Sequence, residues 1–255
     1  DGKTLVYSVG FPNLQANKIQ SQLFRIAADG SSRKQLTSNI AGVHSPRWIQ
    51  QGKRIAFLSS ESGSQQVWMM APDGSERKQL TDIEGGLSDF LLSPDETKIA
   101  YIKEIPFGKS TKDLYPDLPK ATGRIITDLM YKHWDEWTET IPHIFIAELG
   151  ASPVKGGKDI LEGEPYEAPT KPFGGAEELS WSPDGKTLAY SSRKKVGMEY
   201  ALSTNTDIYI YDLVSGQTKN VTAPNGGYDT HPRFSPDGKS LSWISMERDG
   251  YEADL

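Results

Sequence analysis

The amino-acid sequence predicts an all-β fold in which four-stranded antiparallel sheets follow one another as the blades of a β-propeller. Three observations lead to this prediction. One phrase recurs along the chain, its spacing is mostly about 45 to 50 residues, and apolar and polar residues alternate after each copy. The copies are DGKTLVY from Asp1, QGKRIAF from Gln51, DETKIAY from Asp95, DGKTLAY from Asp184 and DGKSLSW from Asp237. The alternation has a period of two residues, which excludes a helical solenoid.

Each repeat unit is expected to contain four strands. A short apolar segment, such as SPRWI around Trp48 or ELSWS around Trp181, supplies the first strand. The recurring phrase begins with residues typical of a tight turn, often Ser-Pro-Asp-Gly, and continues as the second strand. A further phrase, such as VWMMAPDGSERKQLT from Val67, then predicts a third strand, a glycine-containing turn and a short fourth strand.

The repeat divides a partial propeller domain, spanning residues 1–255, into about five units, of which the first and the last are incomplete. Their expected ranges are about 1–40, 41–84, 85–170, 171–224 and 225–255, and the third unit carries an insertion at 104–142. Both ends of the chain interrupt the repeat. Because proteins normally pair or cover open sheet edges, we expect flanking sequence to complete the ring in the native protein.

The strand order sorts the connections onto two rims of the expected propeller. The Asp-Gly-Lys turns join first strands to second strands and lie on one rim. The insertion joins a second strand to a third and lies on the opposite rim, together with the links that lead into each first strand. Polar residues from distant parts of the sequence are therefore expected to converge there.

Composition and motifs exclude several classes of function. The net charge is −6 and the basic residues are scattered, so the chain has no footprint for nucleic acid. No apolar run is long enough to span a bilayer. Cysteine is absent, the four histidines lack metal-binding spacing, and no Gly-x-Ser-x-Gly elbow occurs. We therefore predict no metal, no cofactor and no catalytic nucleophile in this chain.

Two arginines occupy matching positions in Pro-Arg-aromatic triplets, and both are candidate substrate-binding residues. Arg47 and Arg233 could direct guanidinium groups at a carboxylate or a carbonyl group of a ligand. The alternative is that they pair with acidic neighbours in adjacent blades, which repetition of the motif favours.

Two pairs of adjacent carboxylates, Asp135 with Glu136 and Glu177 with Glu178, are also candidates. A substrate ammonium group would be bound well by carboxylates in a partly dry cleft. The alternative is that both pairs belong to solvated surface loops, which are common.

The first of these pairs lies in YKHWDEW, residues 131–137, within the insertion. Met130 to Lys132 alternates like a strand, and we expect it to pair with Ile144 to Ile146, so that residues 133–142 form the tip of a long hairpin. Trp134 and Trp137 are candidate substrate contacts. The interpretation that we favour is that they are anchors, which pack this arm on the rim or against a docked domain.

The Ser-Pro-Asp-Gly-Lys turn with its following strand resembles the repeat of TolB-like propellers. Segments in and after the insertion make the resemblance specific to one family. LPKATGRIITDLMYKHWDEW from Leu118, HIFIAEL from His143 and EPYEAPTKPFGGAEELSWSPDGK from Glu164 together resemble the propeller domain of prolyl oligopeptidase family serine peptidases. The members most similar in these features are bacterial dipeptidyl peptidase V and acylaminoacyl-peptidase-like enzymes, and the resemblance covers essentially the whole chain.

The resemblance implies a non-catalytic propeller that gates and binds substrate for a C-terminal α/β-hydrolase domain carrying a Ser-Asp-His triad, a domain absent from this chain. The whole enzyme would be an exopeptidase that releases dipeptides from the amino ends of oligopeptides. It would be periplasmic or secreted in a bacterium, with its export signal outside this chain. In a related branch a Glu-Glu pair grips the substrate amino terminus. The motif surrounding that pair is not found here, so its role at residues 135–136 or 177–178 is a hypothesis.

A second function from a different class is a TolB-like scaffold propeller that recruits protein partners and has no enzymatic domain. The charged and aromatic insertion favours the peptidase. An oligopeptide and the hydrolase domain are the expected partners, and a homodimer is left open.

Overall fold

The computed structural model describes residues 2–38, 40–127, 129, 131–133 and 135–250. The chain forms two compact units, and each is described by itself. The first comprises residues 1–92, 96–99 and 147–157, and the second comprises 93–95, 100–146 and 158–255. No described helix is long and apolar enough to cross a membrane.

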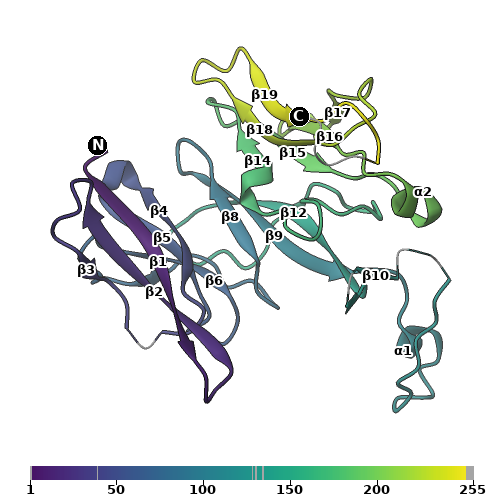
Figure 1. Ribbon diagram of the computed structural model, residues 1–255, viewed down its shortest axis with the longest axis horizontal. Helices are drawn as coiled ribbons and strands as arrows, with labels where there is room; N and C mark the ends of the chain where they lie inside the picture. Colours follow the sequence, from purple (N-terminus) through teal and green to yellow (C-terminus); the bar gives the residue numbers. More distant parts are fainter. Residues whose placement is uncertain (1, 39, 128, 130, 134, 251–255) are drawn as a thin grey trace. The chain divides into compact units, whose positions relative to one another are not determined.

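Two antiparallel sheets make up most of the first unit (Figure 1). One has the strand order β1(Thr4–Asn13), β2(Lys18–Ala27) and β3(Lys34–Gln35). The other has the order β4(His44–Ile49), β5(Arg54–Ser59), β6(Gln66–Met70) and β7(Lys78–Gln79), with the 3-10 helix η1(Gln50–Gly52) between β4 and β5. Leu23, Val43, Ile55, Phe57 and Met70 pack between these strands as a fully buried cluster. The two sheets therefore share one hydrophobic core.

A third sheet contains the insertion. Its strands follow the order β8(Asp89–Leu92), β9(Lys98–Pro106), β12(Thr140–Glu148) and β13(Lys158–Asp159). Between β9 and β12 the chain forms the short helix α1(Thr111–Leu114) and a two-stranded ribbon of β10(Lys132–His133) and β11(Glu136–Trp137), as Figure 1 shows. The insertion thus joins the second and third strands of its sheet.

The remaining sheets belong to the second unit. One has the order β14(Leu179–Trp181), β15(Thr187–Ser192), β16(Asp207–Asp212) and β17(Thr218–Asn220), and the other pairs β18(Asp229–Phe234) with β19(Leu241–Ser245). The 3-10 helix η2(Ala176–Glu178) precedes β14, and α2(Gly197–Leu202) lies between β15 and β16. The prediction of an all-β fold built from four-stranded antiparallel sheets is confirmed.

The recurring Ser-Pro-Asp-Gly turn is held by its own side chains. Ser182 donates its hydroxyl to Asp184 Oδ1 at 2.7 Å and accepts from the Thr187 amide at 3.0 Å. Gly185 has a φ of 65°, a left-handed conformation that glycine adopts without strain. The same hydroxyl-to-carboxylate bond recurs between Ser235 and Asp237 at 2.6 Å. These contacts explain why the phrase marks each passage from a first strand to a second.

A buried threonine closes three of the sheets in the same way. The hydroxyls of Thr37, Thr81 and Thr222 accept the amide hydrogens of Leu23, Val67 and Ile208 at 2.8–2.9 Å. Each hydroxyl also donates to a side chain on the neighbouring strand, at Gln22, Gln66 and Asp207 respectively. The repeated Leu-Thr and Val-Thr at the end of the second phrase therefore satisfies backbone groups on β2, β6 and β16.

The hairpin expected around YKHWDEW has a different register. Lys132 pairs with Trp137 and His133 pairs with Glu136, so β10 pairs with β11, the next strand in the sequence. Phe145 and Ile146 instead pair with Asp159 and Lys158 of β13. The expected pairing with residues 144–146 is wrong because those residues lie in β12, which has β9 on one side and β13 on the other in a four-stranded sheet. Met130 and Trp134 lie outside the described residues.

Candidate functional site

A small cavity in the second unit is lined by five charged residues and is the candidate site. Its volume is about 240 Å³. Its walls come from the insertion, from the segment before η2 and from α2. The lining residues are Lys132, Asp135, Glu136, Trp137, Thr138, Thr140, Glu167, Lys171, Pro172, Phe173 and Tyr200. Three carboxylates and two ammonium groups therefore meet at one cavity, together with three aromatic rings.

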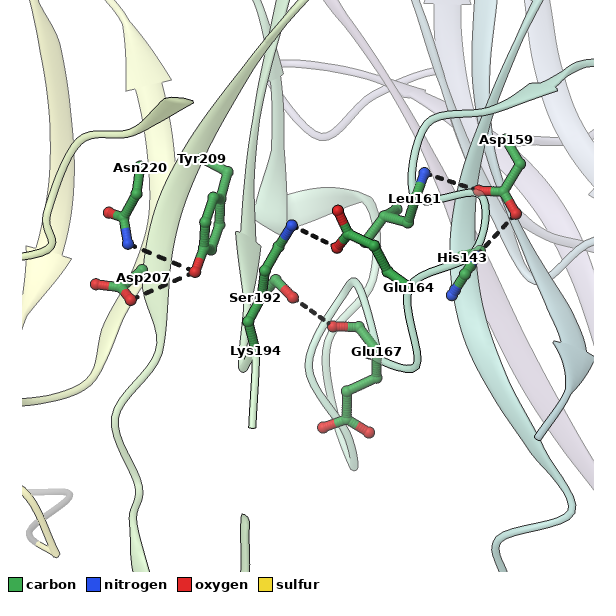
Figure 2. A network of polar contacts seen from close by, with 10 residues as sticks. All are labelled: His143, Asp159, Leu161, Glu164, Glu167, Ser192, Lys194, Asp207, Tyr209 and Asn220. Carbon is green, nitrogen blue, oxygen red and sulfur yellow. Dashed lines mark hydrogen bonds and ion pairs between the residues drawn. The ribbon is translucent and has the colours of Figure 1, made fainter. Parts of the chain in front are cut away.

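Glu167 is the buried carboxylate of this cavity, with 2% of its surface exposed. Its backbone is fixed by two strands, because Ser192 of β15 donates to its carbonyl at 2.8 Å and the next amide, at Ala168, donates to the Pro142 carbonyl in β12 at 2.9 Å. Figure 2 shows the bond from Ser192 and the Glu167 side chain extending away from the other labelled residues. The fold therefore holds this carboxylate at a defined place.

Among the described residues, two donors bind the carboxylate of Glu167, and both use the same oxygen. Tyr200 donates its hydroxyl to Oε1 at 2.8 Å, and the Lys171 amide donates to Oε1 at 3.2 Å. Burial raises the pKa of Glu167, while the Tyr200 hydroxyl, the Lys171 amide and the charges of Arg193 and Lys171 act in the opposite direction. Burial also raises the pKa of Tyr200, with the nearby Glu167 adding to the rise, so Tyr200 remains a neutral donor. Both of these bonds are made at Oε1 rather than at Oε2.

The lysines of the cavity already have partners. Lys171 Nζ lies 2.9 Å from Glu104 Oε1, and Lys132 Nζ lies 5.4 Å from the centre of the Trp137 ring. Asp135 and Glu136 are exposed and stand at the turn of the β10–β11 ribbon. The lining has three carboxylates and two ammonium groups, Glu104 pairs with one of the two, and the charge of Arg193 also acts on Glu167. The three carboxylates are the groups of this cavity that could bind a small cation.

Trp137 is the tryptophan of YKHWDEW that the structure describes, and it lines the cavity with 43% of its surface exposed. The Arg124 guanidinium lies 4.5 Å from the centre of its ring, and Arg124 also contacts Glu139 at 2.9 Å. These contacts lie within the arm itself, so the predicted packing of Trp137 on the rim or against a docked domain stays a prediction. Trp134 falls outside the described residues, so its predicted role stays a prediction.

The second carboxylate pair divides into two different environments. Glu178 is 2% exposed, and its carboxylate accepts hydrogen bonds from the Thr170 amide at 2.9 Å and the Thr170 hydroxyl at 2.7 Å. Burial is the main cause that raises the pKa of Glu178 to about 7. Glu177 is exposed, and neither residue lines the cavity. The Glu178 carboxylate is thus bonded to Thr170 inside the protein and is not part of the cavity lining.

The two candidate arginines have protein partners as well. Arg233 Nη1 donates to the carbonyl oxygens of Pro232 at 2.6 Å, Glu177 at 2.8 Å and Leu179 at 3.3 Å. In the first unit, Arg47 lies 3.6 Å from Asp89 and its guanidinium lies 5.5 Å from the Phe90 ring. Arg47 thus contacts an acidic neighbour, as the structural alternative expected, whereas Arg233 binds backbone carbonyl oxygens.

Sequence reasoning did not single out Glu167, Lys171, Thr170 or Tyr200. All but Tyr200 lie in EPYEAPTKPF, and the signal there was two separated glutamates among prolines and aromatic residues. Tyr200 carried no signal, because only the fold brings α2 to the segment before η2. Among the described residues, no group of three or more His, Asp or Glu could hold a metal ion.

Comparison with known proteins gives close relatives of this sequence. No protein-family model matches it. Dipeptidyl-peptidase 5 of Porphyromonas gingivalis is 64% identical over 255 residues, which is all of this chain and 37% of the relative. Dipeptidyl-peptidase 5 of Porphyromonas endodontalis is 53% identical over the same shares. The chain therefore spans little more than a third of the curated relatives that it matches.

Two solved structures share the fold. The acylaminoacyl peptidase of Pyrococcus horikoshii superposes with a TM-score of 0.56 and 14% identity, covering 86% of this chain and 30% of that one. TolB from Acinetobacter baumannii superposes with a TM-score of 0.55 and 19% identity, covering 95% of this chain and 47% of that one. At such identities the likeness concerns the propeller-like fold alone.

Proposed function

We propose, from the premise that this chain belongs to the dipeptidyl-peptidase 5 family, that it is the substrate-binding and gating propeller segment of a serine exopeptidase. The cavity around Glu167 receives the free amino end of an oligopeptide, and the catalytic residues are supplied by the rest of the enzyme. The relatives are dipeptidyl-peptidases, which supports the release of dipeptides as the reaction.

One observation carries this proposal: a buried carboxylate and two exposed ones face the same small cavity. An ammonium group entering the cavity would find Glu167 Oε2 and the carboxylates of Asp135 and Glu136. Because Glu167 is buried, its attraction for a cation is screened less by water than that of a surface carboxylate. The site is therefore matched to the charge at the amino end of a peptide.

The size of the cavity supports the same assignment. Pockets for whole drug-sized ligands are commonly about 300–1,000 Å³, and this one is about 240 Å³. It could hold the end of a peptide but not a long segment. Fixing the amino end in such a cavity would place one particular peptide bond, at a set distance from that end, against the catalytic residues, as the release of dipeptides requires.

The test uses the full-length enzyme that contains this chain. Glu167→Gln and the double variant Asp135→Asn with Glu136→Gln should each weaken competitive inhibition by a dipeptide with a free amine by about tenfold, the loss of roughly one charged hydrogen bond. Inhibition by the same dipeptide with an acetylated amine should change little. Glu162→Gln is the matched control, because Glu162 is an exposed carboxylate that does not line the cavity.

Equal inhibition by both dipeptides in the wild type and in both variants would contradict the assignment. The comparison of free and acetylated amines separates recognition of the charge from a general loss of the cavity.

The arm between β9 and β12 supports the proposal that a further part of the same enzyme packs against it. Large apolar side chains are exposed along the arm, at Leu114, Tyr115, Leu118, Ile125, Ile126, Leu129, Tyr131 and Trp137. Four of them, Ile125, Ile126, Tyr131 and Trp137, line a second hollow of about 440 Å³. An apolar surface of this extent is typical of an interaction site. We take the catalytic domain of the parent enzyme as its partner.

Export to the periplasm or beyond remains a proposal drawn from the resemblance, and fractionation of cells that express the full-length protein would test it. The scaffold alternative has no specific support, since the likeness to TolB concerns the fold alone.

A further inference from the structure

The segment from Thr170 to Glu178 forms a loop that is closed at its base by one carboxylate. Glu178 Oε2 accepts from the Thr170 amide at 2.9 Å, and Oε1 accepts from the Thr170 hydroxyl at 2.7 Å. Both residues are 2% exposed. Two hydrogen bonds to a buried carboxylate therefore join the first and the last residue of the loop.

The interior of this loop leaves no free space. The Gly174 amide donates to the Thr170 carbonyl at 2.8 Å. A β-carbon at position 174 would lie 2.4 Å from the Thr170 carbonyl oxygen and 3.0 Å from Cδ of Glu178. The backbone at Gly174 thus packs directly on both partners of the closing contact.

The same loop forms one wall of the cavity. Lys171, Pro172 and Phe173 line it, and the Lys171 amide donates to Glu167 Oε1. Lys171 directly follows Thr170, the residue that Glu178 holds. A displacement of Thr170 would therefore move a donor of Glu167 and the wall beside it.

The closing contact is also tied to the neighbouring sheet. Thr230 of β18 donates its hydroxyl to Glu178 Oε1 at 3.3 Å, and the Tyr228 hydroxyl lies 3.3 Å from the Thr170 hydroxyl. Glu178 is therefore anchored to a strand that takes no part in the cavity.

We propose that Glu178 is a positioning residue of the amine-binding cavity, which it serves by holding the Thr170–Gly174 segment rather than by touching the substrate. This inference rests on the proposed function, because it assumes that the cavity binds the peptide amino end. Glu178, a member of the second acidic pair of the sequence, thereby fixes the wall of the cavity. Glu167, which lies outside that pair, is the carboxylate that faces the ligand.

The decisive variants lie at Thr170, where shape can be kept while the hydroxyl is removed. Thr170→Val keeps the volume and the backbone amide but loses the bond to Glu178 Oε1. Thr170→Ser keeps that bond and is the matched control. In the full-length enzyme, Thr170→Val should raise the KM of dipeptide 4-nitroanilide substrates by about tenfold, with kcat changed less than about twofold, whereas Thr170→Ser should resemble the wild type.

Hydrogen exchange of the amides at residues 170–174 supplies a second readout that does not depend on activity. Thr170→Val should accelerate this exchange, and Thr170→Ser should not. If Glu167→Gln raises KM but Thr170→Val does not, the positioning role is overturned and the proposed function stands. If neither variant changes KM, the proposed function falls and the inference falls with it.

Discussion

The pH dependence of stability gives a direct test of the environment of Glu178. Burial is the main cause of its raised pKa, the charge of Glu177 adds to the rise, and the donors from Thr170 and Thr230 oppose it. The resulting pKa is about 7, against an ordinary value of 4.5. We consider the substitution Glu178→Gln, which keeps the shape of the side chain and removes its titration.

The sign of the effect follows from proton binding. Between pH 4.5 and 7 the folded protein holds the Glu178 proton and the unfolded chain releases it, so the free energy of unfolding falls as the pH rises through this range. A rise in pKa from 4.5 to about 7 corresponds to about 3 kcal/mol. That contribution is fully present below pH 4.5 and is lost above pH 7.

Urea unfolding of the wild type and of Glu178→Gln, followed by tryptophan fluorescence from pH 4.5 to 8, measures this contribution. The other titrating groups are common to both proteins and cancel in the difference. We expect the free energy of unfolding of the variant, relative to the wild type, to rise by about 3 kcal/mol across this range. Two parallel curves would refute the reasoning.

Two further predictions concern the loop and the arm. Gly174→Ala should lower the free energy of unfolding, measured with urea, by about 1–3 kcal/mol because its new methyl group would overlap the Thr170 carbonyl. The control is Gly156→Ala, whose methyl group would meet no atom within 4 Å and which should be nearly neutral. Equal losses of stability in the two variants would contradict the packing at Gly174. Trp137→Ala removes the ring beneath the Arg124 guanidinium, a contact of about 0.5–1 kcal/mol, and should speed tryptic cleavage within the arm. Leu14→Ala, at a 91% exposed residue of the β1–β2 turn, should leave that cleavage unchanged; an unaltered rate in Trp137→Ala would contradict an anchoring role.

The sheets were predictable because their signals are local and repeated. The Ser-Pro-Asp-Gly turn carries its own hydrogen bonds, as between Ser182 and Asp184, and the apolar alternation after it marks the buried second strand. The family resemblance seen in the insertion is confirmed by the relatives that match the whole chain. The ribbon at residues 132–137 was assigned a wrong partner because a short alternating segment fits several registers equally well.

The site was predictable only in part, because burial is not a local property. Asp135, Glu136 and Trp137 were found from their composition and do line one cavity. The adjacent Glu177 and Glu178 gave the same signal, yet one is exposed and the other is 2% exposed. Glu167 drew no attention, since its importance depends on Tyr200, a residue 33 positions away that the fold brings to 2.8 Å.

The most direct test of the central claim is a crystal structure of the full-length enzyme with a dipeptide product bound. We expect the dipeptide amino nitrogen within about 3 Å of Glu167 Oε2, and near Asp135 or Glu136, with Glu178 still bonded to Thr170. An amino nitrogen bound elsewhere, with the cavity around Glu167 free of the ligand, would contradict the account.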